Sequence, residues 1–362
     1  MPSITSAWMA WSWKNPRPPA AHPENIYQYS HKSEINIHTM KTHILNAILI
    51  LAGASVLPHS AMAAGGEPAK ALPKTAYLFS YFINNGEDGL HLAWSTDGLN
   101  WKALNGEKSY IQPVVGESKL MRDPCVIYGP DGIFRMVWTT SWGGKTIGYA
   151  SSKDLITWSE QQSIPVGEVD QTGNCWAPEL FYDDATKKYL IFWSSTIGGR
   201  FPETIDGGDG NHRTYYTSTT DFKTYSPTKL FLDPGFNCID TTMIKAGGKY
   251  HVIFKDERSK PVSRKDLRSA VGDSATGPWH DVSEAFTRKG VEGPSVLKMG
   301  DEYVVYFDGF AGGGYGAMKT KDFIKWEEQS TKLVVPPGTK HGSALAVPGK
   351  VIEKLLAHDV KP

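Results

Sequence analysis

A short turn motif that ends in an aromatic residue recurs along the chain and limits the folds open to it. It reads STDGLNW at 95–101 and returns as SKDLITW at 152–158, TDFKTY at 220–225 and TKDFIKW at 320–326, with a degenerate TGPW at 276–279. The aromatic residues that close the five copies lie 57, 67, 54 and 47 residues apart. This period is typical of β-propeller blades, in which one supersecondary unit repeats around a central channel.

The segments that precede these turns have the composition of short strands. RMVWTTS, KYLIFWSS, KYHVIFKD and EYVVYFDG are β-branched and aromatic runs bounded by turns rich in Gly and Asp, and helical periodicity is nearly absent. Five sheets of about four strands account for residues 75–350 without a second domain. A two-sheet sandwich would explain the strand content but not the fivefold repeat. We therefore predict an all-β fold, a five-bladed β-propeller.

Ionisable residues mark the start of the expected inner strand of each blade. The first repeat, 76–104, shows only three strands, and the C-terminal segment HGSALAV supplies the missing inner strand, so pairing of the N- and C-terminal strands closes the ring. Like charges gathered at one end of the channel repel one another, which drives their pKa values apart. Clusters of residues with perturbed pKa values are typical of functional sites. The ring consists of Asp123, Glu179, Asp240, Glu292 and His341, spaced by 56, 61, 52 and 49 residues.

This ring favours acid–base chemistry on a neutral substrate, because no cysteine or histidine metal motif and no phosphate-binding glycine loop accompanies it. Hydrolysis of a glycosidic bond needs one carboxyl group protonated and another ionised. Aromatic side chains near the ring would offer stacking faces to sugars, although each taken singly is more often a blade-packing residue. They are Trp94, Trp142, Trp176, Trp193, Phe201 and Phe310.

Five motifs in a fixed order make the chain resemble glycoside hydrolase family 43, the five-bladed propeller hydrolases of arabinan, arabinoxylan and xylan side chains. Each motif is weak alone, but the order and spacing of the set are specific, and the resemblance covers roughly residues 75–350. The motifs are RDPCVIY (122–128), WAPEL (176–180), CIDTT (238–242), EGPSV (292–296) and KHGSA (340–344).

The resemblance implies an inverting mechanism carried by three carboxyl groups. Asp123 would be the general base that activates water, and Glu292 the general acid that protonates the leaving oxygen. Asp240 would orient that acid and act as its pKa modulator. Inversion requires the base and the acid to stand about 6.5–9.5 Å apart. His341 corresponds to the axial histidine that in many members fixes a central water or calcium ion, so a structural Ca²⁺ in the channel is possible, while no cofactor is required.

The substrate-binding residues implied by the same comparison are Trp176, Trp142, His341 and Glu179. Relatives commonly carry Asp in place of Glu179, and the extra methylene would move a sugar-contacting carboxylate by about one bond length, enough to alter hydroxyl recognition. A second propeller family, the fructan-processing enzymes, also has an Arg-Asp-Pro motif, but the sequence lacks its Asn-Asp-Pro-Asn-Gly and Glu-Cys motifs.

These observations predict an exo-acting glycosidase that removes terminal α-L-arabinofuranosyl units from plant oligo- or polysaccharides. The alternatives are a β-D-xylosidase or endo-arabinanase of the same family, and a carbohydrate-binding propeller without catalysis. The insertion at 197–216 is expected to form a wall of the pocket, and a closed pocket would mean exo action. Because Lys+Arg and Asp+Glu are both 38, no electrostatic footprint for nucleic acid or anionic lipid is present.

The ends of the chain lie outside the predicted propeller. Residues 40–63 read as a secretory signal, with Lys41, an apolar run and the Ala61-Met62-Ala63 cleavage site, so we expect a secreted or periplasmic protein. An uncleaved anchor is the alternative reading of this run, which is short for a membrane span. Residues 1–39 are expected to be a disordered upstream extension, 64–74 a linker and 351–362 a C-terminal tail. The odd count of three cysteines argues against a disulfide framework, with a Cys175–Cys238 bridge left open.

Overall fold

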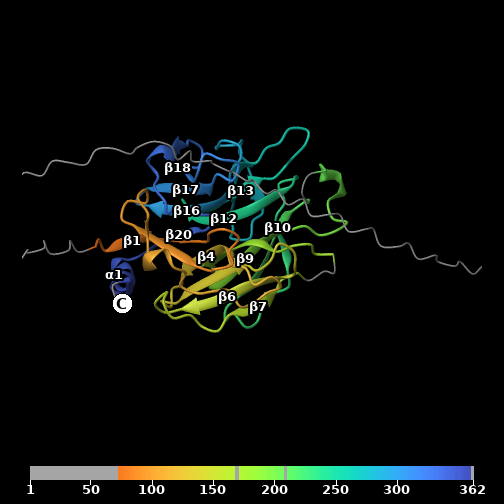
Figure 1. Ribbon diagram of the computed structural model, residues 1–362. Helices are drawn as coiled ribbons and strands as arrows, with labels where there is room; N and C mark the ends of the chain where they lie inside the picture. Colours follow the sequence, from red (N-terminus) through yellow and green to blue (C-terminus); the bar gives the residue numbers. More distant parts are fainter. Residues whose placement is uncertain (1–71, 168–170, 208–209, 360–362) are drawn as a thin grey trace, which may run out of the picture. The chain divides into compact units, whose positions relative to one another are not determined.

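The computed structural model describes residues 72–167, 171–207 and 210–359, which lie within one compact unit, Gly66–Pro362. The predicted signal sequence and upstream extension fall outside these residues, as does nearly all of the predicted linker. The described chain forms five four-stranded antiparallel sheets, so the predicted five-bladed propeller is confirmed (Figure 1). No helix in this part of the chain is long and apolar enough to cross a membrane.

Each blade is a sheet whose strands run in order from the inner to the outer edge. Blade I consists of β20 (Ser343–Pro348), β1 (Thr75–Tyr81), β2 (His91–Ser95) and β3 (Lys102–Ala103). Blade II consists of β4 (Arg122–Tyr128), β5 (Phe134–Thr139), β6 (Thr146–Ser152) and β7 (Gln162–Pro165). Blade III consists of β8 (Trp176–Asp183), β9 (Lys188–Ser195), β10 (Arg213–Thr219) and β11 (Lys229–Leu232). Blade IV consists of β12 (Cys238–Ala246), β13 (Lys249–Asp256), β14 (Asp266–Gly272) and β15 (Trp279–His280). Blade V consists of β16 (Glu292–Met299), β17 (Glu302–Asp308), β18 (Gly316–Thr320) and β19 (Glu327–Glu328).

The ring closes through the C-terminal strand, as the sequence predicts. Strand β20 pairs antiparallel with β1 from Thr75↔Pro348 to Ser80↔Ser343 (Figure 1). The inner strands β4, β8, β12, β16 and β20 contact one another in that order, and β20 contacts β4 again. Closure in this way leaves only short outer edges exposed and fixes five strand starts around one axis.

The repeated turn motif is a hydrogen-bonded loop. In the first copy Ser95 Oγ accepts the N–H of Gly98 at 2.9 Å, while Asp97 Oδ1 accepts the N–H groups of the next two residues at 2.8 Å each. The residue after the aspartate has a positive φ in four copies, and where it is apolar its side chain is buried. Phe222, for example, stacks on Tyr149 of the neighbouring blade with ring centroids 4.5 Å apart. This residue, as well as the aromatic at the end of the motif, joins the blades.

The C-terminal segment differs from the expectation of a tail. Residues Gly349–Asp359 form helix α1, which places Ile352 and Leu355 in the same buried cluster as Leu78 and Met136 of blades I and II. Apolar side chains spaced three residues apart lie on one face of a helix, so this short run buries its apolar side against the propeller. The tail assignment is therefore corrected for residues 351–359.

The three cysteines are buried and free, so the Cys175–Cys238 bridge is not formed. Cys238 belongs to the core cluster between blades III and IV, and Cys175 to the one between blades II and III. They behave as small apolar residues, which is common for unpaired cysteine.

Candidate active site

Four of the five inner strands begin with the same irregularity, a β-bulge. The register of β4, β8, β12 and β16 against the second strand shifts after the first residue or two of each strand. A bulge redirects side chains, and a non-glycine residue held at positive φ costs about 1–3 kcal/mol, which is typical of functional sites. The bulge residue with positive φ is Asp123 (50°), Ala177 (45°), Asp240 (54°) or Gly293 (59°).

The bulge shows that the predicted ring of ionisable residues is not a ring of equivalent positions. Asp123 and Asp240 are the positive-φ residues of their bulges, Glu292 directly precedes that position, and Glu179 lies two residues after it. The prediction that these residues occupy equivalent strand positions was wrong. They differ by one to three positions, and spacings near fifty residues do not reveal so small a difference. Around a bulge such a difference decides which side chains reach the open end of the channel.

A cavity of about 110 Å³ opens where the bulges meet. It brings together six of the seven predicted site residues and leaves out Glu179. The lining residues are Arg122, Asp123, Thr139, Trp142, Trp176, Ile239, Asp240, Glu292 and His341.

Asp123 is held by two neighbours. Thr139 Oγ1 donates to Asp123 Oδ2 at 2.8 Å, and His341 Nδ1 lies 3.4 Å from Oδ1. Thr139 Oγ1 also accepts the backbone N–H of Ala177 at 2.8 Å, which ties blade II to blade III. Both carboxylate oxygens of Asp123 are therefore oriented while the side chain stays at the cavity wall.

Asp240 is buried between blades III, IV and V. Its backbone N–H donates to Ser194 Oγ at 3.0 Å, and its Oδ2 accepts the backbone N–H of Gly293 at 3.1 Å. Burial raises the pKa of Asp240 to about 6; the charge of His341 opposes this rise and that of Glu292 adds to it. A carboxyl group with this pKa exchanges its proton close to neutral pH, as acid–base sites require.

Glu292 reaches the cavity with 31% of its side chain exposed. Its Oε2 accepts a hydrogen bond from Lys255 Nζ at 2.8 Å, and Lys255 is itself only 3% exposed. Sequence reasoning missed Lys255, although a lysine at the end of the apolar run VIFK is a visible signal. The acid candidate is therefore ion-paired on one oxygen yet open to the cavity.

His341 and Glu179 are buried, as Asp240 is. Burial works against a charge on His341, but the carboxylates of Asp123, Asp240, Glu179 and Glu292 outweigh it and raise the pKa of the imidazole. Burial raises the pKa of Glu179 to about 7, while the charge of His341 and a hydrogen bond from Thr242 Oγ1 at 3.2 Å oppose the rise. Glu179 is thus a support behind the site, and the structure does not place it where it could touch a sugar.

Two tryptophans and an arginine form one rim of the cavity. Trp142 is 56% exposed, and the guanidinium of Arg122 lies 4.1 Å from the centre of its ring system. Asn85 Oδ1 accepts from Trp142 Nε1 at 3.0 Å and from Arg122 Nη1 at 2.8 Å, so both side chains are fixed. The rings of Trp142 and Trp176 are nearly perpendicular, with centroids 5.9 Å apart, and both are candidates for sugar stacking.

The insertion at 197–216 acts behind this rim. None of its described residues lines the cavity, so the expectation of a direct wall is corrected. Instead His212 stacks on Trp176 with centroids 5.0 Å apart and is fixed by Asn237 Oδ1, which accepts its backbone N–H at 2.8 Å. The insertion supports the tryptophan that lines the site.

The remaining aromatic candidates divide into packing and surface residues. Trp193 is in the core between blades II and III, and Phe201 lies under the guanidinium of Arg213 at 4.3 Å. Trp94 packs against the core cluster of blades I and II. Phe310 is 49% exposed and lies 4.4 Å from Lys255 Nζ, next to the Glu292 side of the cavity.

The possible calcium site is not supported by the donor set. Within 72–167, 171–207 and 210–359, no group of three His, Cys, Asp or Glu side chains could hold a metal ion. The axial His341 faces Asp123 through Nδ1 instead. We therefore derive no step through a metal.

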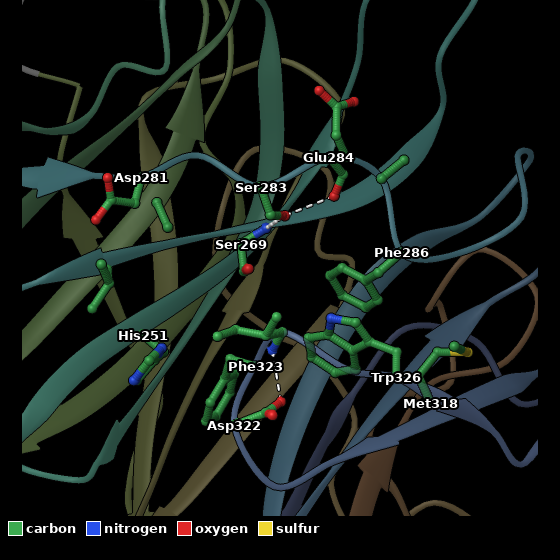
Figure 2. Close-up of a pocket in the computed structure, with 14 residues that line it drawn as sticks. His251, Ser269, Asp281, Ser283, Glu284, Phe286, Met318, Asp322, Phe323 and Trp326 are labelled. Carbon is green, nitrogen blue, oxygen red and sulfur yellow. Dashed lines mark hydrogen bonds between the residues drawn. The ribbon is translucent and has the colours of Figure 1, made fainter.

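A larger cavity of about 590 Å³ is lined by residues of blades IV and V (Figure 2) and shares no lining residue with the cavity at the bulges. Trp326 stacks on Phe286 there at 3.8 Å, and Asp322 accepts the N–H groups of the two residues that follow Phe323 in the turn. Asp281 pairs with His280 at 2.8 Å. Glu284 Oε2 lies 3.5 Å from Arg268 Nη1. Because all three acidic residues of this cavity have such partners, its size alone does not make it a catalytic site.

Comparison with known proteins identifies the family of the chain. A family model of the family-43-related group, described as a probable glycosyl hydrolase domain, matches residues 73–353. An α-L-arabinofuranosidase of Bifidobacterium longum subsp. longum is 24% identical over 325 residues, which is 74% of this chain and 30% of that protein, so the chain spans about a third of its relative's length.

A solved structure of a thermostable family-43 glycoside hydrolase superposes with a TM-score of 0.51 at 16% identity, covering 74% of this chain and 93% of that one. At this identity the likeness shows the fold alone. Because the family model covers more than half of the chain, the protein belongs to glycoside hydrolase family 43 and carries its glycosyl hydrolase domain.

Proposed function

We propose that the protein is an inverting exo-acting α-L-arabinofuranosidase. One observation carries this proposal: Asp123 and Glu292, from blades II and V, line a single small cavity, with Asp240 bonded to the residue that follows Glu292. The relative from Bifidobacterium longum is named as an α-L-arabinofuranosidase, which supports the same sugar.

In the proposed mechanism, Asp123 removes a proton from a water molecule that attacks the anomeric carbon. Thr139 and His341 orient this base, so the carboxylate is already positioned to hold and deprotonate the attacking water. Glu292 protonates the leaving oxygen from the opposite side of the sugar. Attack and departure on opposite faces invert the anomeric configuration, provided the two carboxyl groups stand about 6.5–9.5 Å apart with substrate bound.

The size of the cavity supports exo action. At about 110 Å³ it is smaller than the ~300–1,000 Å³ cavities that hold drug-sized ligands, so it suits one terminal sugar unit. A pentopyranose presents hydroxyl groups similar to those of a pentofuranose, and β-D-xyloside is therefore the competing substrate. The test must include both sugars.

The experiment uses nitrophenyl α-L-arabinofuranoside, nitrophenyl β-D-xyloside and linear arabino-oligosaccharides with the purified protein. Asp123→Asn should abolish turnover on all of them. Glu292→Gln should lose most activity on oligosaccharides but far less on nitrophenyl glycosides, whose leaving groups need little protonation. An exposed matched variant, Glu328→Gln, serves as control. Unchanged turnover in both site variants would refute the proposal, and binding without turnover in the parent would favour a carbohydrate-binding propeller.

We also propose export through the leader that begins at Met40. Amino-terminal sequencing of protein from the periplasm or medium should find a chain that begins shortly after Ala63. A cytoplasmic protein that retains residues 40–63 would contradict this.

A further inference from the structure

The second strand of blades II to V contributes one polar residue near the bulge, paired with a residue of the inner strand. The four pairs are Thr139 with Arg122, Ser194 with Trp176, Lys255 with Ile239, and Asp308 with Glu292. The inner-strand residue of each pair directly precedes the positive-φ residue of its bulge. We call these four polar residues the support ring.

The first two members of the support ring do the same structural work. Thr139 Oγ1 accepts the backbone N–H of Ala177, and Ser194 Oγ accepts the backbone N–H of Asp240. In both cases a hydroxyl oxygen satisfies the N–H of the positive-φ residue in the next blade. A buried N–H without a partner is costly, so this contact stabilises the bulge.

Lys255 breaks this rule at the junction of blades IV and V. An ammonium group has three donors and no acceptor, so it cannot satisfy the N–H of Gly293. That N–H donates to Asp240 Oδ2 at 3.1 Å instead. Lys255 Nζ donates to Glu292 Oε2 at 2.8 Å, and the support residue thereby contacts a side chain of the cavity.

The charges around Lys255 are arranged in an alternating chain. Its Nζ lies 2.8 Å from Glu257 Oε2, and Glu257 is bound in turn by Lys265, which also donates to the Glu257 carbonyl at 3.0 Å. Since Lys265 shares the charge of Glu257, that carboxylate only partly neutralises Lys255. Phe310 covers the ammonium at 4.4 Å.

Burial opposes the charge on Lys255, but the carboxylates of Glu292, Glu257 and Asp240 outweigh it and raise the pKa of the amine. The side chain is therefore a fixed cation throughout the neutral pH range. A buried lysine is costly to retain unless it is paired or used.

We propose that Lys255 is a positioning residue for the acid of the reaction: it anchors Glu292 by Oε2 and stabilises the carboxylate that Glu292 becomes after proton transfer. This inference rests on the proposed function of Glu292. Among the described residues no hydrogen bond engages Glu292 Oε1, so that oxygen is available to carry the proton. As the proton passes to the leaving oxygen, the negative charge that develops on Glu292 meets a preorganised cation, an interaction that is stronger in the transition state than before it.

The first test needs no turnover. Crystal structures of the parent and the variants show where the Glu292 side chain lies. In Lys255→Met and Lys255→Gln the Glu292 carboxyl group should leave its place at the cavity wall or adopt several conformations, because the cation that anchors Oε2 is lost. Lys255→Arg should hold the carboxyl group near its parental position. Lys245→Met, which removes an exposed lysine paired with Asp184, is the matched control.

Glu257→Gln provides a test if both neutral variants fail to fold. It removes the competing carboxylate and leaves the more exposed Lys265 to solvent, so Lys255 interacts more fully with Glu292. The Glu292 carboxyl group should then keep its position on Lys255 Nζ. An unmoved Glu292 in folded Lys255→Met or Lys255→Gln, or a Glu292 released from Lys255 in Glu257→Gln, would overturn the proposal.

The second test uses activity. Lys255→Met should lower kcat/KM on arabino-oligosaccharides by ~100-fold but on the nitrophenyl glycoside by less than ~10-fold, and Lys255→Arg should restore most of the loss. Equal losses on both substrates would show a purely structural role and overturn the proposal. If the parent hydrolyses no glycoside, the proposed function fails, while the structures of the variants still decide whether Lys255 positions Glu292.

Discussion

The backbone N–H of Gly293 donates a hydrogen bond to Asp240 Oδ2 at 3.1 Å, across the junction of blades IV and V. The corresponding N–H groups in blades III and IV donate to a hydroxyl of the support ring, so this contact is specific to the blade that carries Glu292. Gly293 has φ +59°, and a Cβ there would lie 2.4 Å from His341 Cγ. The three residues Asp240, Gly293 and His341 therefore fix the position of the acid candidate from one side.

Replacing Asp240 with Asn should separate its charge from its structural contact. The amide oxygen can still accept the Gly293 N–H, so the bulge should survive, but the negative charge near Glu292 is lost. We expect kcat/KM on oligosaccharides to fall by ~100-fold. The melting temperature at pH 7 should not fall, since the pKa of about 6 means that the parent holds a buried carboxylate at that pH. Asp301→Asn, at an exposed turn, is the control. Retained activity would refute the role of Asp240.

Thr139→Val should weaken both of the contacts that its hydroxyl makes. Loss of the donor to Asp123 leaves the base less well oriented, and loss of the acceptor leaves the Ala177 N–H buried without a partner. We expect kcat to fall by ~10-fold and the free energy of unfolding to fall by about 1–3 kcal/mol. Thr139→Ser keeps the hydroxyl and should restore most of both quantities, as steady-state kinetics and urea denaturation would show. A Val variant with parental kcat would argue against the contact.

Glu179 should make stability depend on pH. Burial raises its pKa from 4.5 to about 7 in the folded protein. Between these values the folded state binds more protons than the unfolded state, so stability falls as pH rises from about 4.5 to 7. Glu179→Gln removes this dependence and can still accept from Thr242. The melting temperature of the variant relative to the parent should therefore rise between pH 5 and pH 8.

The matched control for Glu179→Gln is Glu203→Gln, which changes an exposed residue and should leave the difference constant with pH. A melting-temperature difference for Glu179→Gln that is flat over the same range would contradict the buried, proton-binding state of this carboxyl group.

Trp142→Ala should affect binding more than chemistry. The indole is 56% exposed at the rim, so its loss leaves the core intact. If it stacks on the substrate, KM should rise by ~10-fold with little change in kcat, because a stacking contact of this kind acts equally on ground and transition states. Trp142→Phe should recover part of the loss. Ile324→Ala, at a highly exposed position in blade V, should change neither constant.

Helix α1 should be part of the folded domain. Ile352 is fully buried against blades I and II, and Ile352→Ala should lower the free energy of unfolding by about 2–5 kcal/mol. Glu353→Ala, on the exposed side of the same helix, should cost less than ~0.5 kcal/mol. Denaturant titrations of both variants provide the measurement. Equally small effects of both substitutions would show that this segment does not pack against the domain.

The sequence alone determined the blade count, the closure of the ring by the C-terminal strand and the set of carboxyl groups near the channel end. These features are carried by local signals: a turn with fixed side-chain hydrogen bonds, and short apolar runs whose period of two defines a strand. Asp123, Asp240 and Glu292 could be found because each lies in such a local motif at the start of a strand.

Only the tertiary structure decided which of these residues share the cavity and what supports them. Glu179 lies two residues after the positive-φ position of its bulge, a difference too small to show in the blade spacing, so spacing could not separate it from the cavity residues. Lys255 of blade IV contacts Glu292 of blade V only once the two blades pack together. The burial of α1 likewise depends on surfaces from blades I and II. Local sequence sets the period and the faces of strands, whereas register at a bulge and contacts between blades follow from how the whole ring packs.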